Sequence, residues 1–294
     1  MGIQGREWIR QLPAGLAGQR AILERLLTLC EADDDVAWLL IGCSLARGAA
    51  DSLSDLDVAV GVRDDRFTDA THDFRGAMES LGNLIDSYHH QIPGVVTPHE
   101  RIFAQYSDRC QLDLVIFAAE ASGGSFPGAV VLYDLGDRIA GPGEREPVTP
   151  EQIREWAFRA WCALADLGKY LRRDSRWEAL EQLHQARSQL WQLIAAASGV
   201  PDPQYGLTSI LDFAPGALPA EMAGTVADLD PARLLAAARR LAALLSQAGE
   251  RLHDDQRAAL PLAMARYITD DLASLDLASP LARRHGTDDR AQVR

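Results

Sequence analysis

The chain has 294 residues, of which 47% are hydrophobic and 24% are charged. This composition is typical of a globular protein, and the length predicts about two domains whose cores need no disulfide or metal support. The 42 acidic and 29 basic residues give a net charge of −13. That charge argues against nucleic-acid binding, which needs clustered positive charge, and suits a small cationic ligand better.

The negative charge is concentrated in the first half of the chain. Residues 1–150 have a net charge of −11 and residues 151–294 one of −2, which suggests two units with different roles. The four cysteines form no Cys-x-x-Cys pair and indicate reduced thiols. Because neither a signal peptide nor an apolar run near the ~20 residues of a membrane span is present, we expect a cytoplasmic protein with no membrane partner.

Helices and strands alternate in the first part of the chain. Apolar periodicity predicts helices at 15–31 and 67–80, strands at 36–42, 55–62, 83–92 and 129–134, and a hairpin of 101–107 with 111–118. We therefore expect an α+β domain over residues 1–145, with a mixed β-sheet flanked by helices.

The second part of the chain is predicted to be helical. Residues 141–150 have the composition of a linker, and Thr149 is the predicted cap of a helix that begins at Pro150. Helices are predicted at 150–173, 176–198, 219–228, 231–252 and 255–275. They predict an α-helical bundle over residues 149–278, followed by a disordered tail at 279–294.

The most informative segment is GCSLARGAADSLSDLD, residues 42–57, between two predicted strands. Asp55 and Asp57 are two residues apart on a strand, so their carboxylates point to the same face and repel each other unless a cation lies between them. Mg²⁺ prefers such oxygen ligands and shares them with substrate phosphates. The backbone N–H groups after Gly42, with the Ser44 hydroxyl, can hold phosphate oxygens.

Asp113 is the candidate third carboxylate, because it is a lone acid in an apolar strand, where an unpaired charge is costly. Residues 42–57 together with Asp113 resemble the signature of the DNA polymerase beta nucleotidyltransferase superfamily. Its small-molecule branch, which includes aminoglycoside and lincosamide nucleotidyltransferases, has a Gly-Gly/Ser-Ser-x-Ala-Arg-Gly run, then Ser-Asp-x-Asp, then a later strand aspartate. Cys43 departs from the pattern, since many members have Gly or Ser there, but it is small enough for the turn.

This resemblance implies an active site. Asp55, Asp57 and Asp113 would bind two Mg²⁺ ions, and Ser44 would contact the triphosphate of ATP, the nucleotide donor. The α+β domain followed by a helical bundle also fits the antibiotic-modifying members. A bare Ser-Asp-Leu-Asp match would instead indicate a helix cap or a turn.

Two basic residues are further candidates for nucleotide binding. Lys169 is the single lysine beside 28 arginines, and its compact charge could contact the β- and γ-phosphates, as a helical-domain lysine does in the related enzymes. The alternative is an ordinary surface lysine. Arg47 could contact phosphate or pair with Asp51.

Transfer to a hydroxyl also needs a general base. In the family this acid often comes from near the third aspartate or from the first bundle helix, and Asp166 and Glu178 are the preferred candidates. Together with the metal-binding Asp113 they make up the predicted catalytic set. Asp166 shares a helical face with Lys169. Glu100 and Glu181 are weaker candidates.

Other residues with functional potential favour structural roles. His89, His90 and His99 lack a metal-ligand pattern and are expected to pack or to lie on the surface. The tryptophans of the first two bundle helices are expected mostly in the core, although one could stack on a base or a sugar ring. They are Trp156, Trp161, Trp177 and Trp191.

The sequence thus predicts an enzyme that moves a nucleoside monophosphate, in the first place AMP from Mg-ATP, onto a hydroxyl of a small acceptor. The acidic first half favours a cationic acceptor such as an aminoglycoside, and pyrophosphate is released. One alternative is a non-catalytic, nucleotide-binding regulator or antitoxin-like protein, and another is a protein-modifying AMP transferase. The acceptor stays open, as does the choice between monomer and homodimer.

Overall fold

The computed structural model describes residues 2–92, 96–122, 126–139 and 147–277. The chain divides into two compact units, Met1–Arg145 and Glu146–Arg294. The first unit is mixed α+β and the second is helical, so the predicted fold class is confirmed. The predicted tail and most of the predicted linker lie outside the described residues. Within the described ranges, no helix combines the length and the apolar character that crossing a membrane requires.

The first unit is built on a six-stranded mixed sheet with the strand order β3-β4-β5-β2-β1-β6. Its strands are β1 (Val36–Ile41), β2 (Leu56–Val62), β3 (Leu84–His90), β4 (His99–Tyr106), β5 (Gln111–Ala118) and β6 (Val130–Asp134). Its helices are α1 (Gly2–Arg10), α2 (Ala17–Ala32), α3 (Cys43–Ala46) and α4 (Phe67–Leu81), with 3₁₀ turns at Ala14–Leu16 and Asp64–Arg66.

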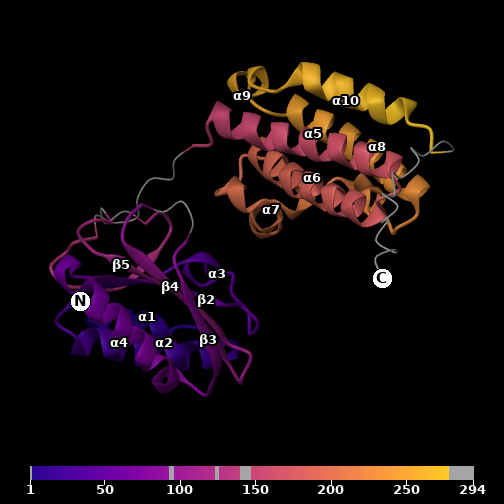
Figure 1. Cartoon of the computed structure of the whole chain (residues 1–294). Coiled ribbons are helices and arrows are strands. Elements are labelled where there is room, and N and C mark those ends of the chain that lie inside the picture. The colour runs from indigo at the N-terminus through magenta and orange to yellow at the C-terminus, as the bar shows by residue number, and fades with distance from the viewer. Residues whose placement is uncertain (1, 93–95, 123–125, 140–146, 278–294) are drawn as a thin grey trace, which may run out of the picture. The chain divides into compact units, whose positions relative to one another are not determined.

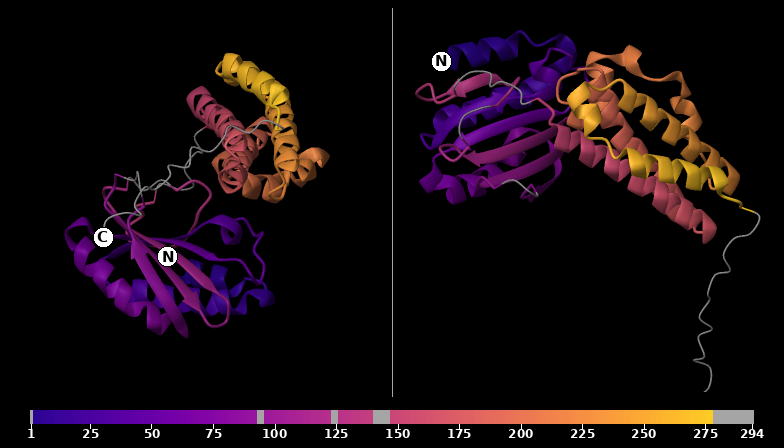
Figure 2. Two further views of the ribbon diagram at one scale, coloured as in Figure 1. Left: turned by 45° about the vertical axis from the view of Figure 1, so that its right-hand side comes forward. Right: turned by 90° about the horizontal axis from the view of Figure 1, so that it is seen from above.

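The sheet has one covered face and one more open face. Helices α1, α2 and α4 lie along the covered face (Figures 1 and 2). Along β5, every second residue is buried, which is the period-2 pattern of a strand with one face in the core. Only β2 and β5 are parallel; every other pair of neighbouring strands is antiparallel. The predicted hairpin of β4 and β5 is confirmed.

Helix α1 was not predicted, because its glycines and polar residues give a weak helical signal. A close approach explains it. A Cβ atom at Gly5 would lie 1.9 Å from the backbone oxygen of Leu132, so only glycine lets α1 pack this tightly on β6. Ile9 then buries its side chain completely in the same core.

The open face of the sheet has a small apolar cluster over β1 and β2. The Trp38 ring lies at a tilt to those of Phe117 and Phe126, with centroids 6.3 and 4.9 Å away. A Cβ atom at Gly61 would lie 2.0 Å from the Trp38 ring, so a glycine is required beneath it.

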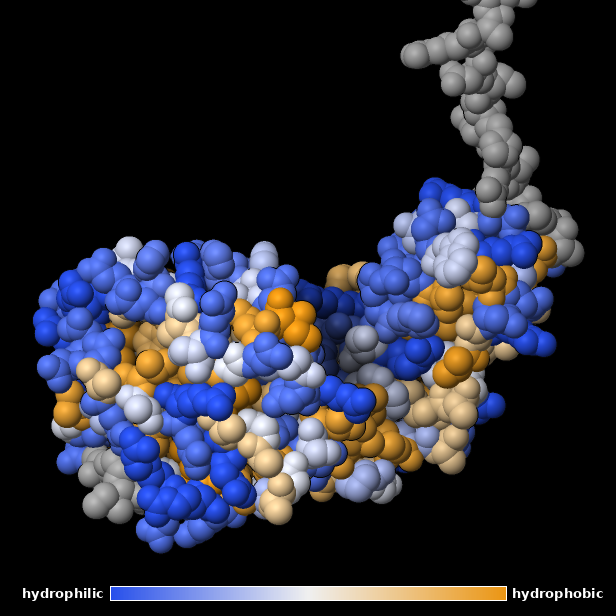
Figure 3. Space-filling model, turned by 90° about the horizontal axis from the view of Figure 1, so that it is seen from below, coloured by the Kyte–Doolittle hydropathy of each residue, from blue (hydrophilic) through white to orange (hydrophobic). Residues whose placement is uncertain are grey.

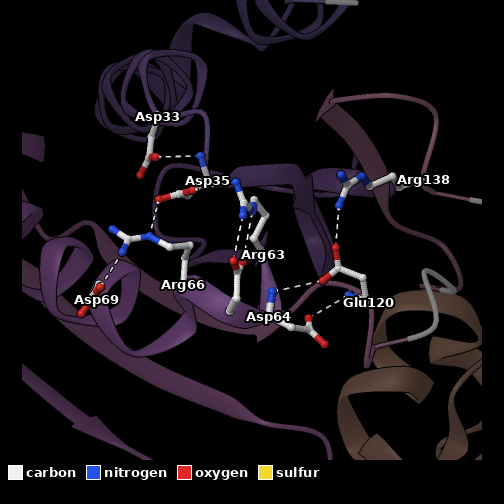
Figure 4. Close-up of polar contacts among 9 residues, drawn as sticks. Asp33, Asp35, Arg63, Asp64, Arg66, Asp69, Glu120 and Arg138 are labelled. Carbon is white, nitrogen blue, oxygen red and sulfur yellow. Dashed lines mark hydrogen bonds and ion pairs between the residues drawn. The ribbon is translucent and has the colours of Figure 1, made fainter.

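A set of exposed ion pairs, called here the distal network, lies at the carboxyl ends of β2 and β5 (Figure 4). The Arg66 guanidinium bridges Asp35 and Asp69, each with an N–O distance of 2.8 Å. Asp64 and Glu120 accept hydrogen bonds from each other's backbone N–H groups, at 3.0 and 3.1 Å. The network's residues are Asp35, Arg63, Asp64, Asp65, Arg66, Asp69, Glu120 and Arg138.

The second unit is a bundle of helices around one apolar core. Its helices are α5 (Pro150–Arg172), α6 (Arg176–Ala197), α7 (Leu207–Phe213), α8 (Pro231–Glu250), α9 (Asp254–Ala258) and α10 (Leu262–Ser274), with 3₁₀ turns at Pro203–Tyr205, Pro215–Ala217 and Ala220–Thr225. The predicted cap of α5 is confirmed. Thr149 Oγ1 accepts from the Gln152 backbone N–H, and the Gln152 side chain accepts from the Thr149 N–H.

Three predictions in this unit were wrong. The helix expected at 219–228 is a 3₁₀ turn, since this segment supplies too little apolar periodicity for a longer helix. The helix expected at 255–275 is divided into α9 and α10, because Pro261 interrupts it. No helix was expected between residues 198 and 219, but α7 lies there and buries Ile210 against the bundle.

The surface of the molecule agrees with the high charge of the sequence. In the view of Figure 3, hydrophilic side chains predominate and apolar side chains gather in separate patches. The exposed apolar residues include Ile85 and Tyr88 on the edge strand β3, at 65% and 66% exposure. Patches of this kind are ordinary on a folded chain.

Candidate active site

Asp57 and Asp113 are register partners on the parallel strands β2 and β5. Partners on neighbouring strands lie about 5 Å apart and point to the same face. Both aspartates are half-buried between residues that are fully buried on the covered face, so both carboxylates project from the open face. The backbone register alone therefore brings two negative charges together.

Asp55 adds a third carboxylate to this pair. It immediately precedes β2, two residues before Asp57, and it is exposed. Partial burial raises the pKa of Asp55 even so, and the charge of Asp113 raises it further. Burial also raises the pKa of Asp57, as do the charges of Asp113 and Asp55, against a lowering by a hydrogen bond with Cys43. The three carboxylates thus lie within electrostatic reach of one another.

The loop between β1 and β2 is held from the covered side of the sheet. Gln19 on α2 is 3% exposed, and its side-chain amide donates to the backbone oxygen of Ser54 at 3.0 Å. Asp51 and Ser54 close a turn, in which Oδ1 of Asp51 accepts from the Leu53 N–H at 2.9 Å. These contacts fix the chain just before Asp55. The Asp51 carboxylate therefore stabilises the turn of this loop.

Cys43, at the start of this loop, departs from the pattern of the superfamily that residues 42–57 resemble. Gly42 has an extended backbone, with φ −116°, and its N–H donates to the Asp57 backbone oxygen at 2.8 Å. Cys43 instead has a positive φ of 49°, which favours glycine and costs other residues some strain. Burial raises the pKa of the Cys43 thiol to about 12, with the charge of Asp57 as the next cause. Ser44 follows in the first turn of α3, half-buried.

Arg101 is a site residue that the sequence prediction missed. It lies on β4, and its Nε donates to Asp113 Oδ1 at 2.7 Å while Nη2 donates to Oδ2. The side chains are 35% and 16% exposed. The hairpin register could have revealed this pair. Phe103 is opposite Asp113, so Arg101 lies one step along the same face of the neighbouring strand.

The donor set fits a hard divalent cation, because carboxylate oxygens are the ligands that Mg²⁺ prefers and three of them converge here. The present arrangement does not close around a metal. Within the part of the chain that the structure describes, no group of three or more His, Cys, Asp or Glu side chains could hold a metal ion as they stand. The guanidinium of Arg101 instead binds both oxygens of Asp113.

Two other candidates of the first unit lie elsewhere. Glu100 is buried on the covered face of β4 and forms an ion pair with Arg75 of α4, so it is not brought together with the aspartates. His99 is 4% exposed and structural. Its Nε2 accepts from the Ile92 N–H at 2.6 Å, so its Nδ1 carries the proton that it donates to the Thr97 oxygen at 2.7 Å.

The remaining predicted site residues lie in the second unit. Asp166 and Lys169 form an i,i+3 ion pair on α5, with an N–O distance of 2.5 Å. The Lys169 ammonium is also 4.7 Å from the centroid of the Tyr170 ring. Glu178 is exposed in the first turn of α6, and Glu181 accepts from Gln185 on the same helix. The roles of Asp166, Lys169 and Glu178 toward substrate stay predictions.

The bundle tryptophans divide as expected with one exception. Trp156 and Trp161 are buried at 8% and 4% exposure, and Trp191 packs against the core. Trp177, at the amino end of α6, is the one outside the core, with 72% of its surface exposed.

No protein-family model and no curated protein matches the chain. Solved structures do match it, and two of them match over most of its length. An aminoglycoside 6-adenyltransferase from Bacillus subtilis is 13% identical, with 88% of this chain and 99% of that chain covered and a TM-score of 0.35. A nucleotidyltransferase-like protein from Exiguobacterium sibiricum 255-15 is also 13% identical, with 86% and 87% covered and a TM-score of 0.38. Both likenesses are distant, and the function proposed below rests on the side chains of the site.

Proposed function

We propose that the protein transfers a nucleoside monophosphate from a nucleoside triphosphate to a hydroxyl group of a small acceptor, with AMP from Mg-ATP as the first candidate. The observation that carries the proposal is the convergence of Asp55, Asp57 and Asp113 at the start of two parallel strands. Carboxylates that lie close enough to repel one another, as the raised pKa values of Asp55 and Asp57 indicate, are costly for a fold and are typical of a functional site. The sequence pattern of residues 42–57 supports the same reaction.

In this reaction the hydroxyl oxygen of the acceptor bonds to the α-phosphorus, and the bond from that phosphorus to the α–β bridging oxygen breaks. Pyrophosphate leaves, and the hydroxyl proton passes to a carboxylate base. Asp55, Asp57 and Asp113 would hold the divalent metal, whose contribution when bound is to neutralise charge on the phosphoryl oxygens. Gly42, Ser44, Arg47 and Lys169 are the proposed nucleotide-binding residues.

The base is proposed to be Asp166 or Glu178. Asp113 is instead proposed as a metal ligand, and Arg101 donates to both its oxygens. Asp166 is half-exposed beside Lys169, so one helical turn would offer a base and a phosphate contact together. A cationic acceptor such as an aminoglycoside suits the net charge of −11 in residues 1–150.

Pyrophosphate release tests the reaction. Purified protein would be incubated with ATP, GTP, CTP or UTP, Mg²⁺ and a panel of aminoglycosides and lincosamides, with the Asp55→Asn/Asp57→Asn double variant as the blank. We expect release that needs both an acceptor and the carboxylates. If no nucleotide binds in the presence of Mg²⁺, the proposal is wrong.

A second candidate function is favoured by one observation. Because the Arg101 guanidinium forms an ion pair with the Asp113 carboxylate, the site as it stands suits a protein that binds nucleotide without turning it over. Such a regulator would bind ATP equally well with Asp57→Asn and would release no pyrophosphate with any acceptor. Nucleotide binding that is lost in this variant would exclude it.

Lys169 gives a separate test in the second unit. If its ammonium binds the triphosphate, Lys169→Gln should raise the KM for the nucleotide about 10-fold, the value of one charge-assisted hydrogen bond. Lys169→Arg should recover only part of this loss, because a guanidinium has a different shape. Unchanged KM values in both variants would identify Lys169 as a surface residue, and Arg159→Gln on the same helix is the matched control.

A further inference from the structure

Arg101 is the one guanidinium that the described contacts place on the aspartate cluster itself. It approaches from β4, the strand next to β5, and donates through Nε and Nη2 to the two oxygens of Asp113. This two-point geometry is the strongest form of an arginine–carboxylate contact. Each oxygen of Asp113 therefore already accepts one hydrogen bond from Arg101.

The charge of Arg101 also acts on the rest of the cluster. Its guanidinium stays ionised at any ordinary pH, and its pKa is raised further by Asp113 and by Asp57. One positive charge thus compensates part of the repulsion among three carboxylates. In electrostatic terms, Arg101 stands where a divalent cation would provide the same compensation more completely.

We propose that Arg101 gates the site: it holds Asp113 when no metal is bound, and a metal reaches all three carboxylates only after Arg101 leaves Asp113. The inference rests on the proposed function, because it concerns the same carboxylates. At 35% exposure the Arg101 side chain borders solvent, so it can move away without unpacking the core. Metal and guanidinium then compete for one carboxylate, and the metal affinity of the protein is set by that competition.

Binding of Mn²⁺ alone tests the gate. The free Mn²⁺ signal in electron paramagnetic resonance would be titrated against the full chain and its Arg101→Gln variant. We expect Arg101→Gln to bind Mn²⁺ at least ~10-fold more tightly, because a charge-assisted contact no longer competes. Arg101→Lys should fall between the two, since an ammonium makes a single contact.

Arg75→Gln is the matched control. Arg75 of α4 pairs with Glu100 on the covered face of the sheet. Its variant therefore also breaks an arginine–carboxylate contact, while it leaves the aspartates untouched. Its Mn²⁺ affinity should equal that of the unmodified protein. If Arg101→Gln fails to fold, as judged by its thermal unfolding, Arg101→Lys decides the question by itself.

The outcomes separate the gate from the proposed function. Equal Mn²⁺ affinity with and without Arg101 would overturn the gate and leave nucleotidyl transfer untouched. Weaker binding in Arg101→Gln would also overturn it, because Arg101 would then be orienting Asp113 for the metal. If neither protein binds Mn²⁺, even with ATP present, both the gate and the proposed function are wrong.

Discussion

The two ends of the β2–β5 strand pair treat their acidic residues in opposite ways. At the carboxyl ends, the acids of the distal network each bind an arginine or a backbone N–H. At the amino ends, Asp55, Asp57 and Asp113 lie within electrostatic reach of one another, Arg101 binds Asp113, and Asp55 has no hydrogen bond or ion pair with any described residue. The Glu120 side chain also raises the pKa of Asp64 in the distal network, but both of these acids accept a backbone N–H, whereas Asp55 does not. This difference is why we assign the ligand site to the amino ends.

The largest expected effect is a difference in enzymatic activity between variants at the two ends of the β2–β5 strand pair. Asp113→Asn should lower the rate of pyrophosphate release at least ~100-fold, because one carboxylate of the cluster is lost. Asp64→Asn, which removes an acid from the distal network, should leave the rate unchanged. Both rates come from the same coupled assay of pyrophosphate. If the two variants lose activity equally, the distinction between the ends has no functional meaning.

A smaller effect concerns the pH dependence of stability. The raised pKa of Asp57 means that the folded protein holds this proton more tightly than the unfolded chain does. Its contribution to the free energy of unfolding is therefore greatest at low pH and is lost as pH rises through the raised pKa. Urea unfolding of metal-free protein and of Asp57→Asn should give a difference in favour of the variant that grows from pH 4 to pH 7.

The size of this difference should stay below about 1 kcal/mol, because solvent screens a half-buried group. Saturating Mn²⁺ should reverse its sign, since the metal stabilises the unmodified protein by binding to it. A difference that is the same at pH 4 and pH 7 would show that Asp57→Asn acts through packing and not through charge.

The smallest effect belongs to the distal network. Arg66→Gln removes the contacts to Asp35 and Asp69 and should lower the melting temperature slightly at low salt. At 1 M salt the loss should vanish, because the screening length falls to about 3 Å. Thermal unfolding at two salt concentrations measures it. A loss that persists at 1 M salt would mean that Arg66 acts through packing.

The sequence was a better guide to elements than to contacts between them. The alternation of β5 and the capping box of Thr149 are local signals, and the structure has both elements. Gly5 weakened the helical signal of α1, because the reason for a glycine there is the close contact with Leu132, a residue distant in sequence. In the bundle, the sequence pattern predicted one helix across Pro261, whereas in the structure α9 ends at Ala258 and α10 begins at Leu262.

The site shows the same division between local and non-local information. The short spacing of Asp55 and Asp57 is visible in the sequence, and Asp113 attracts attention as a lone acid in an apolar strand. The register that sets Asp57 beside Asp113 is a parallel pairing across a long stretch of chain, which no local pattern encodes. Arg101 was missed because its role depends on that same pairing and on the hairpin beside it.

The parallel register of β2 and β5 also bears on the lifetime of the site. Backbone amides of interior strands exchange their hydrogens with solvent only when a large part of a domain opens, whereas loop amides exchange through local fluctuations. Asp57 and Asp113 are positioned by interior strands, and Asp55 by the loop that Gln19 secures. Two of the three carboxylates should therefore keep their spacing for as long as the unit stays folded, whereas Asp55 should keep its position only for as long as the loop contacts of Gln19 hold.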